Sequence, residues 1–222
     1  MNGHIDHHFD EALLALKQQI SLMAGKVKEM LADCISALNN KDRGLAEKII
    51  EADNTINALE ISIDEQCIHL LARYQPVAAD LRFITRGLKI VTDLERIGDL
   101  VVNSAQRVID IIEAGGEAIL DLNEMSITVQ KMLQKSIDAF INGNVSLAEE
   151  VLKSDDKVDE MTERFIMDLI KMVESMPTKI NIIFPTTSII RYLERIGDHS
   201  TNIAELAIYM IKGRDIRHGK PL

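Results

Sequence analysis

One hexapeptide, Leu-Glu-Arg-Ile-Gly-Asp, occurs twice in this chain, at residues 94–99 and again at residues 193–198. The two copies are ninety-nine residues apart, and an asparagine follows each at the same distance, as Asn103 and Asn202. Self-similarity at a fixed spacing indicates an internal duplication. Any fold predicted for this chain therefore contains two similar halves.

Apolar residues recur at steps of three and four in both halves, which is the pattern of amphipathic helices. Polar turns, prolines and the pair Gly115-Gly116 interrupt this pattern. The predicted helices span about 9–38, 42–73, 77–114, 122–141, 146–175 and 180–212. No stretch alternates in the way that a strand does. The chain is therefore predicted to be all-α, with one three-helix unit at 1–114 and a second at 117–222.

Three positions have the chemistry of helix ends. Asp42 is a suitable N-cap for the second helix. Ser146, with Glu149 three residues later, has the pattern of a capping box and is predicted to cap the fifth helix. Gly213 is predicted to end the sixth helix, since glycine is common directly after a helix.

The composition limits the functions open to the chain. Hydrophobic residues make up 46% of the 222 residues, which is typical of a globular protein. The excess of 35 acidic residues over 25 Lys and Arg gives a formal net charge of −10. Binding to nucleic acid requires clustered basic residues, so no nucleic-acid partner is expected. A surface of this charge attracts cations instead.

The sequence predicts a cytoplasmic protein. It has no run of about 18 apolar residues that would form a transmembrane helix, and its polar N-terminal residues lack the features of a signal peptide. Cys34 and Cys67 have neither metal-binding nor redox spacing and are expected to be buried in a reducing compartment. Any association with a membrane is therefore expected to be indirect.

Each hexapeptide contributes to a ladder of oxygen-bearing side chains, because residues four apart share one face of a helix. The ladders are Glu95, Asp99 and Asn103 in the first half, and Glu194, Asp198 and Asn202 in the second. Two carboxylates one turn apart repel each other, so a cation is expected to compensate. Oxygen ligands suit hard cations such as Mg, Mn, Ca or Fe. Zinc usually recruits Cys or His, and neither recurs with the ladder.

The middle helix of each half carries a second polar stripe. The stripes are Asp53, Asn57, Glu60 and Asp64 in the first half, and Asp155, Asp159 and Thr162, with Glu163 beside them, in the second. An antiparallel arrangement brings each stripe towards the ladder of its own half, but the pattern leaves the register of the two helices open. His199 follows Asp198 directly, lies about 100° around the helix from the ladder, and is not expected to be a ligand.

The acidic ladders have a simpler interpretation as solvated helix faces paired with basic residues such as Arg96 and Arg195. Two observations favour metal binding over this alternative. The complete ladder occurs in both halves, and both copies retain a mid-helix glycine, Gly98 and Gly197. Glycine inside a helix costs about 1 kcal/mol relative to alanine, so its retention indicates a close backbone approach or room for an ion.

Taken together, the motifs resemble the PhoU family, the accessory regulators of the bacterial high-affinity phosphate transporter. The resemblance rests on both hexapeptides, on Gln-Pro-Val-Ala-Ala-Asp-Leu-Arg at residues 75–82, and on Gly-Asp-His-x-x-Asn-Ile-Ala-Glu at residues 197–205. It covers about residues 5–213.

The resemblance implies two tandem three-helix bundles related by a pseudo-twofold axis, with multinuclear metal clusters lined by the acidic motifs. It also implies further oxygen ligands from the neighbouring helix. The metal ligands expected on this basis are Glu95, Asp99, Asn103, Glu194, Asp198, Asn202, Asp53, Asp155 and Asp159. Asn57 stands where the second half has Asp159, so the two halves are not expected to load metal equally.

The resemblance further implies a non-catalytic adaptor that represses phosphate uptake and the phosphate-starvation response. The expected partners are the phosphate ABC transporter, through its ATP-binding subunit, the phosphate-sensing histidine kinase, and a second copy of the chain in a homodimer. The transporter and the kinase tie such a protein to the inner face of the membrane.

The alternative is a di-metal carboxylate enzyme built in a helix bundle. Such sites typically contain two Glu-x-x-His motifs, and the chain has none. A structural bundle without metal is the third interpretation.

Overall fold

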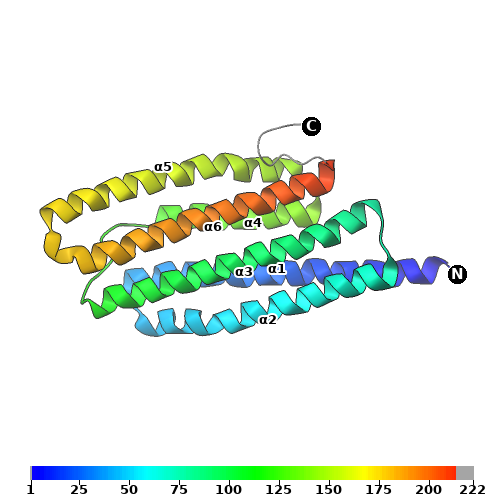
Figure 1. Ribbon diagram of the computed structural model, residues 1–222, viewed down its shortest axis with the longest axis horizontal. Helices are drawn as coiled ribbons and strands as arrows, with labels where there is room; N and C mark the ends of the chain where they lie inside the picture. Colours follow the sequence, from blue (N-terminus) through cyan, green and yellow to red (C-terminus); the bar gives the residue numbers. More distant parts are fainter. Residues whose placement is uncertain (1, 214–222) are drawn as a thin grey trace.

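The structure is a computed structural model that describes residues 2–213, and these fold into six long α-helices (Figure 1). The helices are α1 (Asn2–Asn40), α2 (Arg43–Tyr74), α3 (Ala78–Glu113), α4 (Asn123–Asn142), α5 (Val145–Ser175) and α6 (Ile180–Lys212). A short 3-10 turn, Pro177–Lys179, precedes α6. The described residues contain no strand, and the all-α prediction is confirmed.

All helix ends except the start of α1 lie within two residues of their predicted positions, and one predicted cap differs. Asp42 caps α2 as expected, because its Oδ1 accepts a hydrogen bond of 2.9 Å from the Leu45 amide. The prediction that Ser146 caps α5 is wrong. Asn144 is the cap, and its side chain accepts from the Leu147 amide at 3.3 Å. Asparagine is as good a cap as serine, so the helix starts at the first suitable residue after the turn.

Helix α1 begins at Asn2 rather than near Phe9. The residues before Phe9 are mostly polar, so they give no apolar periodicity from which a helix is predicted.

The helices form two bundles, α1–α3 and α4–α6, which correspond to the two halves of the sequence. Figure 1 shows the bundles side by side, with α3 and α6 adjacent along the middle of the molecule. The α3–α6 pair has the most extensive contact of all, and α1 also packs on α4. The α2–α3 turn and the α5–α6 turn lie at opposite ends of the molecule, so α3 and α6 run antiparallel. This arrangement is the predicted pseudo-twofold.

Aliphatic and methionine side chains fill one continuous core shared by the bundles. Ile97 and Ile196, which occupy the same position in the two hexapeptides, are fully buried in it. Cys34 and Cys67 are also fully buried, and burial raises the pKa of both thiols to about 12. These thiols are therefore unreactive at neutral pH. Within residues 2–213, no helix is both long and apolar enough to cross a membrane.

The turn after α3 requires glycine at two adjacent positions. Gly115 has a φ of +70°, a conformation that glycine adopts without strain. Gly116 donates from its backbone amide to the Ile111 carbonyl at 2.9 Å and lies against α6. A Cβ on Gly116 would lie 2.7 Å from two carbons of Ile182 and 3.0 Å from the Ile111 carbonyl oxygen. The first bundle is thus held close to α6 at this point.

Replacing Gly116 by alanine is expected to destabilise the fold by about 1–3 kcal/mol, because the added methyl overpacks against Ile182 and a backbone oxygen. Gly25→Ala is the matched control. No heavy atom lies within 4 Å of a Cβ at Gly25 in α1, so alanine there is expected to stabilise by up to about 1 kcal/mol. Urea unfolding of the two variants measures this difference, and equal free energies of unfolding would contradict the proposed contact.

Candidate metal site

The hexapeptide places its acids at the border between the core and the solvent. In α3, Leu94, Ile97 and Gly98 are buried, while Glu95 is partly exposed beside them. The second copy repeats this arrangement in α6, where Leu193, Ile196 and Gly197 are buried and Glu194 is partly exposed. The buried residues hold each helix in place, so the position of the carboxylates is set by packing.

The two glycines bring the middle helices close. A Cβ on Gly98 would lie 3.3 Å from Cγ2 of Ile56 and 3.9 Å from Oδ1 of Asp53. In the second half, a Cβ on Gly197 would lie 3.7 Å from Oδ1 of Asp155. Each mid-helix glycine therefore faces the aspartate of the neighbouring middle helix. The stripe and the ladder meet in both halves, which settles the register that the sequence left open.

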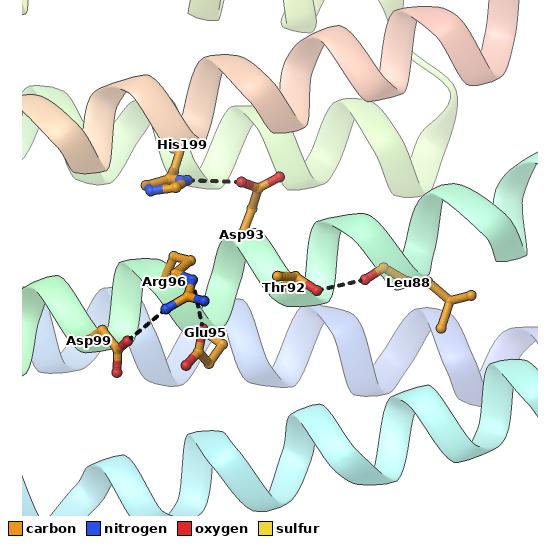
Figure 2. A network of polar contacts seen from close by, with 7 residues as sticks. All are labelled: Leu88, Thr92, Asp93, Glu95, Arg96, Asp99 and His199. Atoms are coloured by element: carbon orange, nitrogen blue, oxygen red, sulfur yellow. Dashed lines mark hydrogen bonds and ion pairs between the residues drawn. The ribbon is translucent and has the colours of Figure 1, made fainter.

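In the first half, Asp53 is only partly satisfied. Its Oδ2 accepts a hydrogen bond of 2.8 Å from the Asn57 side chain, whereas its Oδ1 is buried without a partner. Figure 2 shows Arg96 reaching both acids of the ladder, with its Nε 3.5 Å from Glu95 and its Nη1 3.5 Å from Asp99. The pairing of Arg96 with the ladder, expected under the simpler interpretation, is thus present. These salt bridges are long, and the Arg96 side chain is 60% exposed, so they contribute little to stability.

Three acids of the first half, Glu95, Glu60 and Asp64, have raised pKa values. Burial raises the pKa of Glu95 most, and the charges of Asp99, Glu60 and Asp53 raise it further, while Arg96 opposes them. Glu60 has a raised pKa from burial and from Asp64 and Asp99, and burial raises the pKa of Asp64. The stripe of α2 therefore continues the acidic region beyond the ligands that the family resemblance implied.

The second half shows the same effect more strongly. The pKa of Asp155 is raised to about 6, first by burial and then by the charges of Asp159 and Asp198. The pKa values of Asp159 and Asp198 are also raised, in each case first by burial and then by Glu194. Asp159 and Asp198 are nevertheless exposed, so this half is open to solvent. Arg191 pairs with Glu194 at 2.9 Å.

The outer members of the ladders, Asn103 and Asn202, are exposed on the next turn. Both ladders therefore open towards solvent at that end.

His199 faces the other bundle. Its Nδ1 lies 2.8 Å from Oδ1 of Asp93, so the pair joins α6 to α3 (Figure 2). Sequence reasoning missed Asp93 because its repeat counterpart is Tyr192 and that of His199 is Leu100, which gave no recurring signal.

The oxygen atoms of these side chains are suitable ligands for a hard cation, although the carboxylates do not converge on one point. No group of three or more His, Cys, Asp or Glu side chains among residues 2–213 is arranged to hold an ion directly. The unpartnered Oδ1 of Asp53 and the mutual repulsion of the acids are what a bound cation would satisfy.

The family model of the PhoU domain matches the chain twice, over residues 20–108 and 122–207. The chain belongs to the PhoU family. It is 38% identical to the phosphate-specific transport system accessory protein PhoU homolog of Pseudomonas aeruginosa, over 98% of this chain and 91% of that protein. The PhoU protein of Escherichia coli is 32% identical over the same shares.

Solved structures of the PhoU family have the same fold. The crystal structure of PhoU from P. aeruginosa superposes with a TM-score of 0.87, at 38% identity, over 92% of this chain and 99% of that chain. The phosphate transport system regulatory protein PhoU from Streptococcus pneumoniae gives 0.85 at 30% identity, over 93% and 98%. The agreement spans both bundles, so the arrangement of α3 beside α6 is a property of the family fold.

The metal-free protein is expected to be more stable at pH 5 than at pH 7. An acid whose pKa is raised on folding binds protons more readily in the folded state, so stability falls as the pH rises through that pKa. For Asp155 this interval runs from its ordinary value of 3.8 to about 6. Thermal unfolding in EDTA measures the change, and Asp155→Asn is expected to reduce the difference between the two pH values.

Ion pairs on the surface have the opposite effect on the pH dependence of stability. Lys157 lowers the pKa of Glu124, and Lys135 lowers that of Glu150. The comparison of wild type with Asp155→Asn removes their common contribution. If the stability of the two proteins depended on pH in the same way, folding would not raise the pKa of Asp155, and the prediction would be wrong.

Proposed function

We propose that this chain is a non-catalytic regulator of phosphate uptake and of the phosphate-starvation response. The observation that supports this is the double match to the PhoU domain, together with relatives named as accessory proteins of the phosphate-specific transport system. The relatives match over nearly the whole of this chain.

The proposed partners are the phosphate ABC transporter, through its ATP-binding subunit, and the phosphate-sensing histidine kinase. A homodimer is the proposed working form. Acting in the cytoplasm, such a protein reaches the inner face of the membrane through these partners. Its role is to connect the state of the transporter to the output of the kinase.

Metal ions of the hard class, Mg, Mn, Fe or Ca, are proposed to brace the two bundles. A cation would supply positive charge between helices that otherwise repel each other. The residues proposed to hold it are Glu95, Asp99, Asn103 and Asp53 in the first half, and Glu194, Asp198, Asn202, Asp155 and Asp159 in the second. Ligands from two helices then tie α2 to α3 and α5 to α6, so that metal binding stabilises the fold.

The enzyme alternative has less support. The ladders contain no Glu-x-x-His motif, and both thiols are buried with pKa values of about 12. His199, the histidine beside the second ladder, is paired with Asp93. Di-metal carboxylate enzymes built in helix bundles typically contain the Glu-x-x-His motif twice.

Metal content tests the assignment of the ladders. The quadruple variant Glu95→Ala, Asp99→Ala, Glu194→Ala and Asp198→Ala is expected to lose bound metal, measured by elemental analysis of the purified chain after loading and dialysis. The control makes the same change in charge at four exposed acids away from the ladders, Glu47, Glu117, Glu149 and Glu174. Metal retained by the ladder variant would reject the assignment.

The regulatory role is tested in cells. A strain that lacks this protein is expected to express a phosphate-starvation phosphatase reporter even when phosphate is plentiful, because the repressing signal to the kinase is lost. The wild-type chain supplied in trans restores repression, and the quadruple ladder variant is expected to restore it less well. Normal repression in the deletion strain would contradict the proposed function.

A further inference from the structure

Exposed apolar side chains recur at equivalent positions in the two halves of the fold. Ile68 on α2 and Ile170 on α5 are separated by the same number of residues as Asp53 and Asp155, and both are at least half exposed. Leu81 on α3 and Ile180 on α6 are separated by the same number of residues as the two hexapeptides, and both are also exposed. Single exposed apolar residues are common on protein surfaces. Two equivalent pairs in both halves form a pattern that needs a cause.

These residues belong to the two ends of the molecule. The first hairpin end is residues 68–85, around the connection between α2 and α3, and the second is residues 170–184, around the connection between α5 and α6. Figure 1 shows the two connections at opposite ends of the molecule. Each hairpin end exposes further apolar side chains. They are Val77 in the first hairpin end, and Val173, Met176 and Phe184 in the second.

The separation of the hairpin ends is set by α6. Arg82, directly after Leu81, donates from its Nε to the Met210 carbonyl at 3.0 Å, so the first hairpin end lies beside Met210. Met210 follows Ile180 by thirty residues of one helix, which corresponds to about 45 Å along the helix axis. Both hairpin ends are attached to the same continuous core, so their separation is fixed by the fold.

The two hairpin ends also face the same side of the molecule. Helices α3 and α6 lie side by side and antiparallel (Figure 1), and a twofold axis that exchanges two such helices is perpendicular to the plane that contains them. Rotation about this axis leaves equivalent residues, such as Leu81 and Ile180, on the same face. At the second hairpin end this face is open to a partner, because Ile180 and Phe184 line a groove of about 490 Å³ together with residues at the end of α3.

The hairpin ends differ in charge from the rest of the chain. Each contains two basic residues and one acidic residue, which gives a net charge of +1 with His69 neutral. The residues are Arg73, Arg82 and Asp80 in the first hairpin end, and Lys171, Lys179 and Glu174 in the second. The remaining residues of this chain of net charge −10 therefore carry −12. A partner surface that complements either hairpin end is apolar with an acidic rim.

We infer that the two hairpin ends dock at the same time on two identical protein subunits, each of which presents an apolar surface with an acidic rim. Two equivalent surfaces related by a pseudo-twofold axis match a partner that has the same symmetry. The inference rests on the proposed function, and it assigns the pair to the two ATP-binding subunits of the phosphate transporter, because an ABC transporter carries these subunits side by side.

The fixed separation of the hairpin ends gives this docking a regulatory consequence. Two weak contacts made by one rigid molecule bind much more tightly than either contact alone, but only where their spacing matches that of the partner surfaces. The chain therefore responds to the separation of the ATP-binding subunits, which changes as ATP is bound and hydrolysed.

The test is binding of the full-length chain to the intact transporter of the same organism in lipid nanodiscs, measured by biolayer interferometry. Ile68→Ser with Leu81→Ser alters the first hairpin end, and Ile170→Ser with Ile180→Ser alters the second. Each double variant is expected to weaken binding by about 100-fold or more, because it leaves only one of the two contacts. The two losses are expected to be similar, which distinguishes docking at both ends from docking at one.

Leu14→Ser with Leu22→Ser is the matched control. Both leucines are about half exposed on α1 and lie outside the hairpin ends, so this variant is expected to bind as the wild type does. All the replaced residues are exposed, and the melting temperatures of the variants are therefore expected to stay close to that of the wild type. Empty nanodiscs control for binding to lipid.

Wild-type affinity in either hairpin-end variant, an equal loss in the control variant, or equally tight binding to empty nanodiscs would overturn the inference. It would also be overturned if the hairpin-end variants bound the transporter normally but lost binding to nanodiscs that hold the histidine kinase. A wild type that does not bind the transporter would reject the proposed transporter partner as well, so the two failures are distinguishable.

Discussion

Repulsion between carboxylates held on neighbouring helices is the constraint around which each bundle is organised. Gly98 and Gly197 let the middle helix approach closely, and they bring Asp53 and Asp155 towards the ladders of α3 and α6. The acids cannot separate without disturbing the fully buried core behind them. The fold therefore opposes electrostatic strain with hydrophobic packing, at the same place in both halves.

The two halves resolve this strain differently. In the first, Arg96 reaches both acids of its ladder, and Asn57 donates to Asp53. In the second, Arg191 pairs with Glu194 alone, and Asp159 adds a negative charge where Asn57 stands in the first half. The third helices have kept their hexapeptide, whereas the middle helices have diverged. The electrostatic differences between the halves therefore originate outside the hexapeptides, at Asn57 and Asp159 in the middle helices and at Thr92 and Arg191 in the third helices.

Periodicity and capping chemistry predicted the helices well, because both are local properties of the chain. The exceptions were local as well, since Asn144 precedes Ser146 as a cap and the polar start of α1 has no apolar pattern. The sequence could not predict the axial register of α2 against α3. A four-residue spacing identifies one face of a helix, but it does not say how far along the neighbouring helix that face lies. Repetition identified the ladders, and for the same reason it could not reveal the unrepeated pair Asp93 and His199.

The identity of the two hexapeptides follows from the environment of each of their residues. The leucine and isoleucine are buried in the shared core, and the glycine faces the middle helix. The glutamate and the aspartate form the ladder, while the arginine is exposed beside them. A longer residue at the glycine would meet the middle helix, at Ile56 in the first half and at Val158 in the second. Packing against the core and the middle helix therefore accounts for the leucine, the isoleucine and the glycine in both copies, and the ladder accounts for the two acids.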